Sequence, residues 1–116
     1  MSAIDKSILI LGCFDTKGEI FSYLRKRILE QGERVITVNT GVMGTTDYFP
    51  VDIESDVVAM EAGFTIADLR NEGNRGQAID IMSTGAANIV SKLIATKGVK
   101  AAIGMGGGGG TYIALF

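Results

Sequence analysis

Short apolar runs alternate with longer amphipathic segments along the chain. Residues 7–12 (SILILG) form a continuous apolar run, residues 34–40 (RVITVNT) are rich in β-branched side chains, and residues 99–104 (VKAAIG) form a third apolar run. Runs of this length are typical of strands that are buried on both faces of a parallel sheet. The pattern therefore predicts three strands.

A helix is predicted between the first two strands, beginning at about Lys17. Thr16 and Glu19 have the T-x-x-E spacing of a capping box, and Gly32 stands where a helix commonly ends. The expected core face consists of Ile20, Leu24 and Ile28, with Phe21 and Leu29 beside them. A helix in this position would cover one face of the sheet.

The longest helix is predicted over residues 76–97, where apolar residues recur at intervals of three and four. Gly85 lies inside this stripe, and glycine costs about 1 kcal/mol there relative to alanine. We therefore expect Gly85 to allow close packing of the helix on the sheet.

Less regular structure is expected between residues 41 and 65. Residues 41–52 contain two glycines and the only proline, so no helix or strand is predicted for them. Ser55 and Thr65 are expected to cap two short helices over residues 56–62 and 66–72.

The order of these elements predicts an α/β fold with a doubly wound parallel sheet. A strand, a helix and a second strand make a right-handed crossover, and the first strand would then lie between the other two. Residues 99–104 would stand at an edge of the sheet, although their composition is that of an interior strand. We therefore expect the sheet to be incomplete, its missing neighbour supplied by more of a longer polypeptide or by a partner.

Composition excludes several classes of protein. The chain has 116 residues, a formal net charge of −2 and 47% hydrophobic residues, which suits one folded domain and gives no basic footprint for nucleic acid or an anionic membrane. With no histidine and one cysteine, it has neither an internal disulfide nor a ligand set for structural zinc. No segment has the length and composition of a membrane span. A cytoplasmic protein is the simplest interpretation.

The first candidate loop follows residues 7–12 and contains Asp15, Thr16 and Lys17. It matches neither the Walker pattern nor the dinucleotide fingerprint G-x-G-x-x-G. It nevertheless presents a carboxylate, a hydroxyl and an ammonium group at a helix N-terminus, where the helix dipole favours an anion. Lys17 is a candidate phosphate contact and Asp15 a candidate contact to a ribose or to magnesium. The alternative is that Asp15 and Thr16 only cap the helix and that Lys17 is solvated.

The second candidate loop is the run GMGGGGGT over residues 104–111, which follows the third strand. Successive glycines are costly to order, but they allow a ligand to approach the backbone amides closely, as in an anion-binding nest. The candidate contacts are Gly106, Gly107, Gly108, Gly109, Gly110 and Thr111. A flexible linker is the alternative, and the loop alone does not distinguish ATP, a dinucleotide, a sugar phosphate or a carboxylate.

Three segments, taken together, carry a resemblance to a known family. They are LGCFDTKGEIFSYLR, NRGQAIDIMSTGAANIV and AAIGMGGGGGTYIAL, in this order. They resemble the ATP-binding domain family named after the tomato mosaic virus resistance protein, whose bacterial members are long and largely uncharacterised. The family often has serine where this chain has Gly108 and aspartate where it has Asn39. The chain thus lacks a hydroxyl near the phosphates and a charged ribose contact at these positions.

The resemblance implies that residues 1–116 are the N-terminal part of a Rossmann-like, three-layer nucleotide-binding domain, commonly homodimeric. It implies ATP as the ligand, possibly together with magnesium, and contacts from Asp15, Thr16, Lys17 and residues 106–111. Arg75 lies in the second of the three segments and is a further candidate for a phosphate contact, with a solvated or helix-capping role as the alternative.

Three functions remain open at this stage. The first is ATP binding in a regulatory or accessory part of a longer protein. The second is an NAD-dependent oxidoreductase domain, although the fingerprint G-x-G-x-x-G is absent and Asn39 replaces an acidic ribose contact. The third is a fragment of a phosphotransferase. Because the chain has no histidine, a general base would be a carboxylate or a lysine, and the sequence identifies no catalytic set.

Overall fold

The computed structural model of the chain describes residues 6–72, 75–96 and 98–104. Its elements in chain order are β1 (Ser7–Gly12), α1 (Phe14–Glu30), β2 (Arg34–Asn39), α2 (Ser55–Glu61), α3 (Ile66–Glu72), α4 (Arg75–Thr96) and β3 (Val99–Gly104). The three predicted strands and the four predicted helices are therefore present, with bounds that either agree with the prediction or differ from it by one to three residues.

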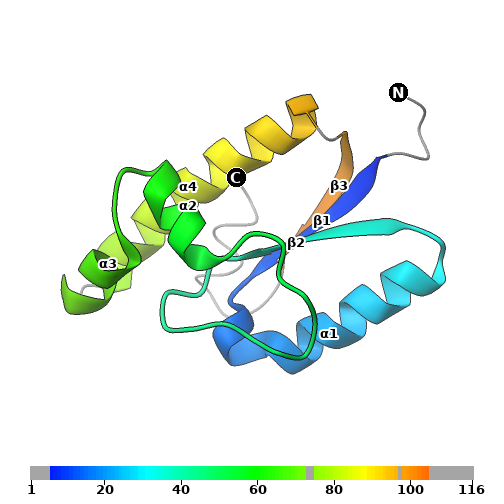
Figure 1. Ribbon diagram of the computed structural model, residues 1–116, viewed down its shortest axis with the longest axis horizontal. Helices are drawn as coiled ribbons and strands as arrows, with labels where there is room; N and C mark the ends of the chain where they lie inside the picture. The colour runs from blue at the N-terminus through cyan, green and yellow to red at the C-terminus, as the bar shows by residue number, and fades with distance from the viewer. Residues whose placement is uncertain (1–5, 73–74, 97, 105–116) are drawn as a thin grey trace.

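The strands form a parallel sheet in the order β2-β1-β3. Helix α1 covers one face of this sheet, and α2, α3 and α4 lie on the other side (Figure 1). This arrangement confirms the predicted three-layer α/β fold, which is consistent with a Rossmann-like domain. The sheet is also incomplete as predicted, because β3 pairs only with β1 among the described residues and its Ala101 and Ala102 are exposed.

Alternation along β1 divides the core between the two faces of the sheet. Leu9 and Leu11 belong to the cluster that includes residues of α2, α3 and α4, whereas Ile10 faces α1. On the α1 side, the Phe14 ring makes edge-to-face contacts with the rings of Phe21 and Phe49, each at a centroid distance of 5.0 Å. Strand β1 is thus buried on both faces, as its continuous apolar run predicts.

The predicted core face of α1 is partly wrong. Phe21 is fully buried, whereas Ile20 is 49% exposed and Leu29 is 40% exposed. A helical period of 3.6 residues admits a stripe that starts at either residue 20 or 21, so periodicity alone does not decide between them. Gly12 decides the choice, because a Cβ atom there would overlap the Phe21 ring, which lies against the end of β1.

The predicted start of α1 and its capping box are also wrong. The helix begins at Phe14, and Lys17 has a non-helical backbone (φ −122°, ψ 23°) that kinks it at the position where the start was predicted. The Thr16 hydroxyl donates to the Cys13 carbonyl at 3.4 Å instead of accepting a hydrogen bond from a helix N–H. The extra turn forms because the N–H of Phe14 has a buried partner in Asn39.

The two short helices have different caps. Thr65 caps α3 as predicted: its hydroxyl accepts from the Asp68 N–H at 3.2 Å, and the Asp68 carboxylate accepts from the Thr65 N–H at 3.4 Å. The prediction for Ser55 is wrong, since Glu54 is the N-cap residue of α2 and Ser55 is the first helical residue.

The loop between β2 and α2 has no helix or longer strand, as predicted, but it closes the outer edge of β2. Val38 and Ile53 form a single parallel bridge. The Asp52 carboxylate accepts hydrogen bonds from the Thr37 N–H at 2.8 Å and from the Thr37 hydroxyl at 3.2 Å. These contacts satisfy groups that an edge strand otherwise exposes.

The Asn39 side chain joins three segments at the carboxyl end of β2. Its Oδ1 accepts from the N–H groups of Phe14 at 3.1 Å and Gly41 at 2.8 Å. Its Nδ2 donates to the Gly44 carbonyl at 2.8 Å and to Glu54 Oε1 at 3.1 Å. The residue is fully buried. All the hydrogen-bonding capacity of the amide is therefore used to hold the start of α1, the loop and the start of α2 together.

Gly85 allows a close approach, but to α2 and not to the sheet as predicted. A Cβ atom at this position would overlap the carbonyl oxygen of Val58. An ion pair between Lys92 Nζ and Glu61 Oε1 at 2.6 Å holds the same two helices together. The sequence pattern shows that a small residue interrupts the stripe, but it does not show which element approaches it.

We expect Gly85→Ala to lower the free energy of unfolding by about 1–3 kcal/mol, because the new methyl group overpacks the contact with Val58. The change is measured from the urea midpoint, with Ser91→Ala on an exposed position of α4 as the control. A stabilised Gly85→Ala variant would mean that helix propensity outweighs the contact.

We expect Asn39→Leu to lower the free energy of unfolding by about 3 kcal/mol, since it leaves the buried N–H groups of Phe14 and Gly41 without an acceptor. Thr84→Ala serves as the control, because its hydroxyl is exposed and bonds only within α4. A loss below about 0.5 kcal/mol, the usual range for surface substitutions, would show that water replaces the amide at no cost.

Candidate functional site

Two chain segments leave the carboxyl edge of the sheet from adjacent strands. Leu11 near the end of β1 pairs with Gly104 at the end of β3. Helices α1 and α4 lie on opposite faces of the sheet, so β1 and β3 flank the point where the strand order reverses (Figure 1). Open α/β sheets bind their ligands at such a switch point. The segments that follow β1 and β3 therefore start from neighbouring strand ends at this switch point.

Asp15 has one carboxylate oxygen that is engaged and one that is not. Its Oδ2 accepts a hydrogen bond from the Met43 N–H at 3.2 Å. Its Oδ1 is buried and has no hydrogen-bond partner among the residues that the structure describes. The carboxylate lies so close to Gly41 that a Cβ atom there would overlap it. A buried oxygen without a partner requires an explanation, and a bound cation, water or ligand donor is the usual one.

Thr16 and Lys17 are exposed at the same turn. The N–H groups of both residues point to the Cys13 carbonyl, at 3.3 Å and 3.0 Å. Among the described residues, the Lys17 ammonium group forms no ion pair. The structure therefore brings Asp15, Thr16 and Lys17 together at the end of β1 and leaves the charge of Lys17 exposed.

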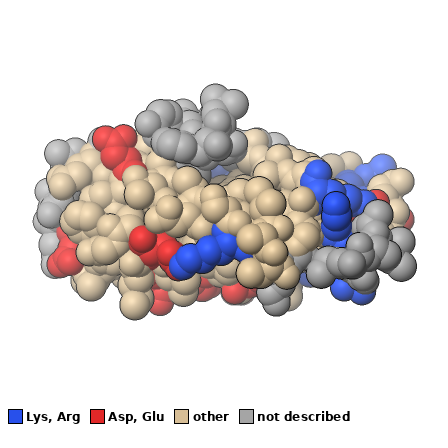
Figure 2. Space-filling model, turned by 90° about the horizontal axis from the view of Figure 1, so that it is seen from above, with Lys and Arg blue, Asp and Glu red and all other residues tan. Residues whose placement is uncertain are grey.

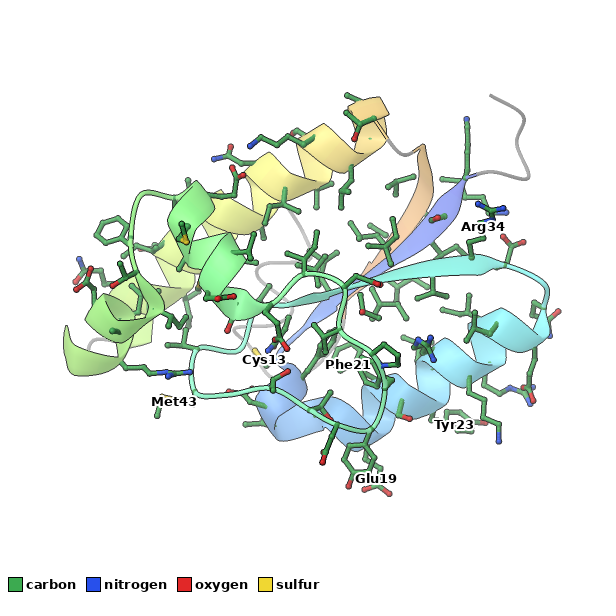
Figure 3. All side chains as sticks on the ribbon, viewed as in Figure 1. Cys13, Glu19, Phe21, Tyr23, Arg34 and Met43 are labelled. Carbon is green, nitrogen blue, oxygen red and sulfur yellow. The ribbon has the colours of Figure 1, made fainter. Side chains whose placement is uncertain are left out.

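The turn after β1 lies at the opposite end of the sheet from the start of β2. Figure 3 shows Cys13 at the junction of β1 and α1 and Met43 on the neighbouring loop, whereas Arg34 lies at the opposite end of the sheet. Cys13 Sγ lies 3.9 Å from the Thr40 hydroxyl, so the turn after β1 also contacts the end of β2.

The other predicted contacts are only partly described. Arg75 is the first residue of α4, but its side chain lies outside the described part of the structure. The remaining candidate contacts lie outside the described residues: Gly106, Gly107, Gly108, Gly109, Gly110 and Thr111. Gly104, which leads toward this run, ends β3.

Sequence reasoning missed the role of Asn39 and its neighbour Glu54. Glu54 accepts from the Asn39 amide and, through Oε2, from the Thr45 hydroxyl at 2.7 Å. Asn39 thus has no group left for a ribose at the end of β2. The available signal was an amide that ends a β-branched run directly before a turn, a position at which asparagine commonly bonds to nearby backbone.

Basic side chains on one face of the molecule gather mainly toward one end. Figure 2 shows one face on which most atoms belong to neither acidic nor basic residues, with lysine and arginine side chains gathered toward the end where the strands of Figure 1 begin. No continuous basic surface is visible on this face.

The described part of the chain contains neither a membrane-spanning helix nor a cluster of metal-ligating side chains. Its helices include none that is both long and apolar enough to span a membrane. The cysteine and the acidic residues of this part include no group of three or more that is placed to hold a metal ion.

The chain is similar to curated bacterial proteins that are much longer than it is. A UPF0261 protein of Clostridium tetani is 38% identical over 113 residues, which are 97% of this chain and 28% of that protein. A UPF0261 protein of Rhizobium meliloti is 36% identical and one of Brucella suis is 30% identical, each over 108 residues. The chain spans 26–28% of the length of these relatives.

A family model matches nearly the whole chain. It is described as the N-terminal domain of the uncharacterised protein family UPF0261, and it covers residues 6–115, including both candidate loops. The predicted relationship to largely uncharacterised bacterial proteins is therefore confirmed, and its narrower part, the ATP-binding family, stays a prediction. From the match over residues 6–115, the chain belongs to the UPF0261 N-terminal domain family.

Proposed function

We propose that the chain binds ATP between the segments that follow β1 and β3. The observation that carries the proposal is the pairing of β1 with β3 at the switch point of the sheet, which starts both segments from neighbouring strand ends. The turn after β1 contributes Asp15, Thr16 and Lys17, and the sequence after β3 continues into the run Gly106–Gly110. Resemblance to the ATP-binding family of the tomato mosaic virus resistance protein supports ATP as the nucleotide.

Phosphates are the part of the nucleotide that suits these residues. Lys17 carries an exposed charge with no ion pair among the described residues, and the glycine run offers backbone N–H groups without Cβ atoms. Magnesium in nucleotide sites is held by one or two carboxylates together with phosphate oxygens. The buried Oδ1 of Asp15, which has no hydrogen-bond partner in the described part of the chain, fits the role of such a ligand.

In this proposal the domain is a regulatory or accessory part of a longer cytoplasmic protein and acts as a homodimer. It spans little more than a quarter of its relatives, so a chemical step that uses the bound nucleotide would take place on other parts of such a protein. Asn39 is fully occupied and is no ribose ligand, which favours ATP over the dinucleotide alternative with its acidic residue at the end of β2.

We expect Lys17→Ala to weaken ATP binding about 10- to 100-fold, because it removes a charged hydrogen bond to phosphate. Lys26→Ala, on the exposed side of α1, is the matched control and leaves the affinity unchanged. The measurement is isothermal titration of the full chain with ATP, ADP and NAD in the presence of magnesium.

Two results of that titration would contradict the proposal. Tighter binding of NAD than of ATP would favour the dinucleotide alternative. A lack of saturable binding of any nucleotide would favour the interpretation of the glycine run as a linker.

We expect Asp15→Asn to abolish most of the enhancement of ATP binding by magnesium, because the amide replaces a carboxylate ligand. Binding of ATP without magnesium should change less than about threefold, since the contact with the Met43 N–H is retained. The comparison is between titrations with magnesium and with a chelator. An unchanged magnesium effect in Asp15→Asn would exclude Asp15 as a ligand.

A further inference from the structure

A pocket lies beside the loop that Asp15 holds. It has a volume of about 290 Å³ and is lined by Gly44, Thr45, Glu54, Ser55, Asp56, Ile66 and Arg70. The residues come from the loop after β2, the start of α2 and the start and middle of α3. The pocket therefore belongs to the β2 side of the carboxyl edge, next to the site at the end of β1.

Ser55 forms part of the pocket wall. It is only 6% exposed. Because Ser55 lines the pocket, a polar group of a ligand in the pocket is a suitable partner for it.

Two carboxylates and one guanidinium group define the charge of the pocket. Glu54 is already held by Asn39 and Thr45, but each carboxylate oxygen can accept more than one hydrogen bond. Asp56 is exposed, and its Oδ1 accepts a hydrogen bond from the Val57 N–H at 2.8 Å. Arg70 donates through Nε to the Val42 carbonyl at 2.6 Å, which leaves its terminal nitrogens for other contacts.

This composition suits a neutral ligand with hydroxyl groups better than a phosphate. Two carboxylates against one guanidinium group give a net charge of −1, which repels an anion. Neighbouring hydroxyls of a ribose donate to a carboxylate, as they do to the acidic residue of dinucleotide-binding folds. Ile66 and the plane of the Arg70 guanidinium group offer surfaces on which a base can stack.

We propose that this pocket binds the nucleoside part of the nucleotide, with Asp56 and Glu54 accepting the ribose hydroxyls and Ser55 completing the polar wall. The inference rests on the proposed function, in which the phosphates lie at the turn after β1. It assigns the ribose contact to the start of α2, because Asn39 at the end of β2 has no free group.

The loop between the two sites connects them. Met43 donates its N–H to Asp15, whereas the carbonyl of Val42 accepts from Arg70. A Cβ atom at Gly44 would lie 3.7 Å from the Asp15 Cβ, and Gly44 also lines the pocket. The pocket therefore lies beside the turn after β1, so one nucleotide could contact the turn with its phosphates and the pocket with its nucleoside part.

The test compares ATP, adenosine, inorganic tripolyphosphate and an ATP analogue without the 2′ and 3′ hydroxyls on the full chain. We expect Asp56→Asn to weaken ATP and adenosine binding about tenfold and to leave tripolyphosphate unchanged. The analogue should bind equally to wild type and Asp56→Asn. Ser55→Ala should weaken ATP about two- to tenfold. Asp80→Asn on the exposed side of α4 is the matched control, and urea midpoints verify that each variant folds.

The outcomes separate the two proposals. If Lys17→Ala weakens ATP but Asp56→Asn and Ser55→Ala do not, the pocket assignment is overturned and the phosphate site stands. If adenosine binds in a manner that depends on Asp56 while tripolyphosphate does not bind, the pocket stands and the phosphate site is overturned. If none of the ligands binds saturably, both proposals fail.

Discussion

The Asn39 side chain is the interaction on which the carboxyl edge of this domain depends. One buried amide accepts from the N–H groups of Phe14 and Gly41 and donates to Gly44 and Glu54. The groups it joins are separated by up to 40 positions in the chain, yet all of them border the candidate site. A carboxylate there would lack the two donors, and an apolar residue would lack all four bonds, so few side chains can replace it.

Most of the fold could be predicted because it follows from local patterns. The apolar runs at residues 7–12 and 99–104 are the observed strands, and the three-and-four spacing after residue 76 is the observed long helix. The errors arise where a distant contact decides the local structure. Phe21 is buried in place of Ile20 because its ring lies against Gly12. Gly85 faces α2 and not the sheet, because the Val58 carbonyl oxygen occupies the space that a Cβ atom at Gly85 would fill. No periodicity contains that information.

The location of the candidate site could be predicted from the sequence, but most of its contacts could not. The sequence places Asp15, Thr16 and Lys17 after the first strand, and the topology puts that turn next to the end of β3. The sequence does not predict that Asp15 is held by Met43, that Asn39 is occupied, or that Glu54, Ser55 and Asp56 border a pocket. These features depend on the path of residues 41–54. Individual polar contacts hold this loop, and such contacts leave no repeating pattern in the sequence.

The two carboxylate oxygens of Asp15 have different contacts, and together they link the proposed phosphate site to the pocket. One oxygen holds the loop through the Met43 N–H, and the other is buried with no hydrogen-bond partner among residues 6–72, 75–96 and 98–104. A cation or donor at the second oxygen would fix the carboxylate, and with it the loop that supplies Gly44 to the pocket. The conformational entropy of that loop would then be lost only once when both parts of the ligand bind. Phosphate and nucleoside on one molecule should therefore bind more favourably than the two separate pieces, because the second contact is made within an already ordered site.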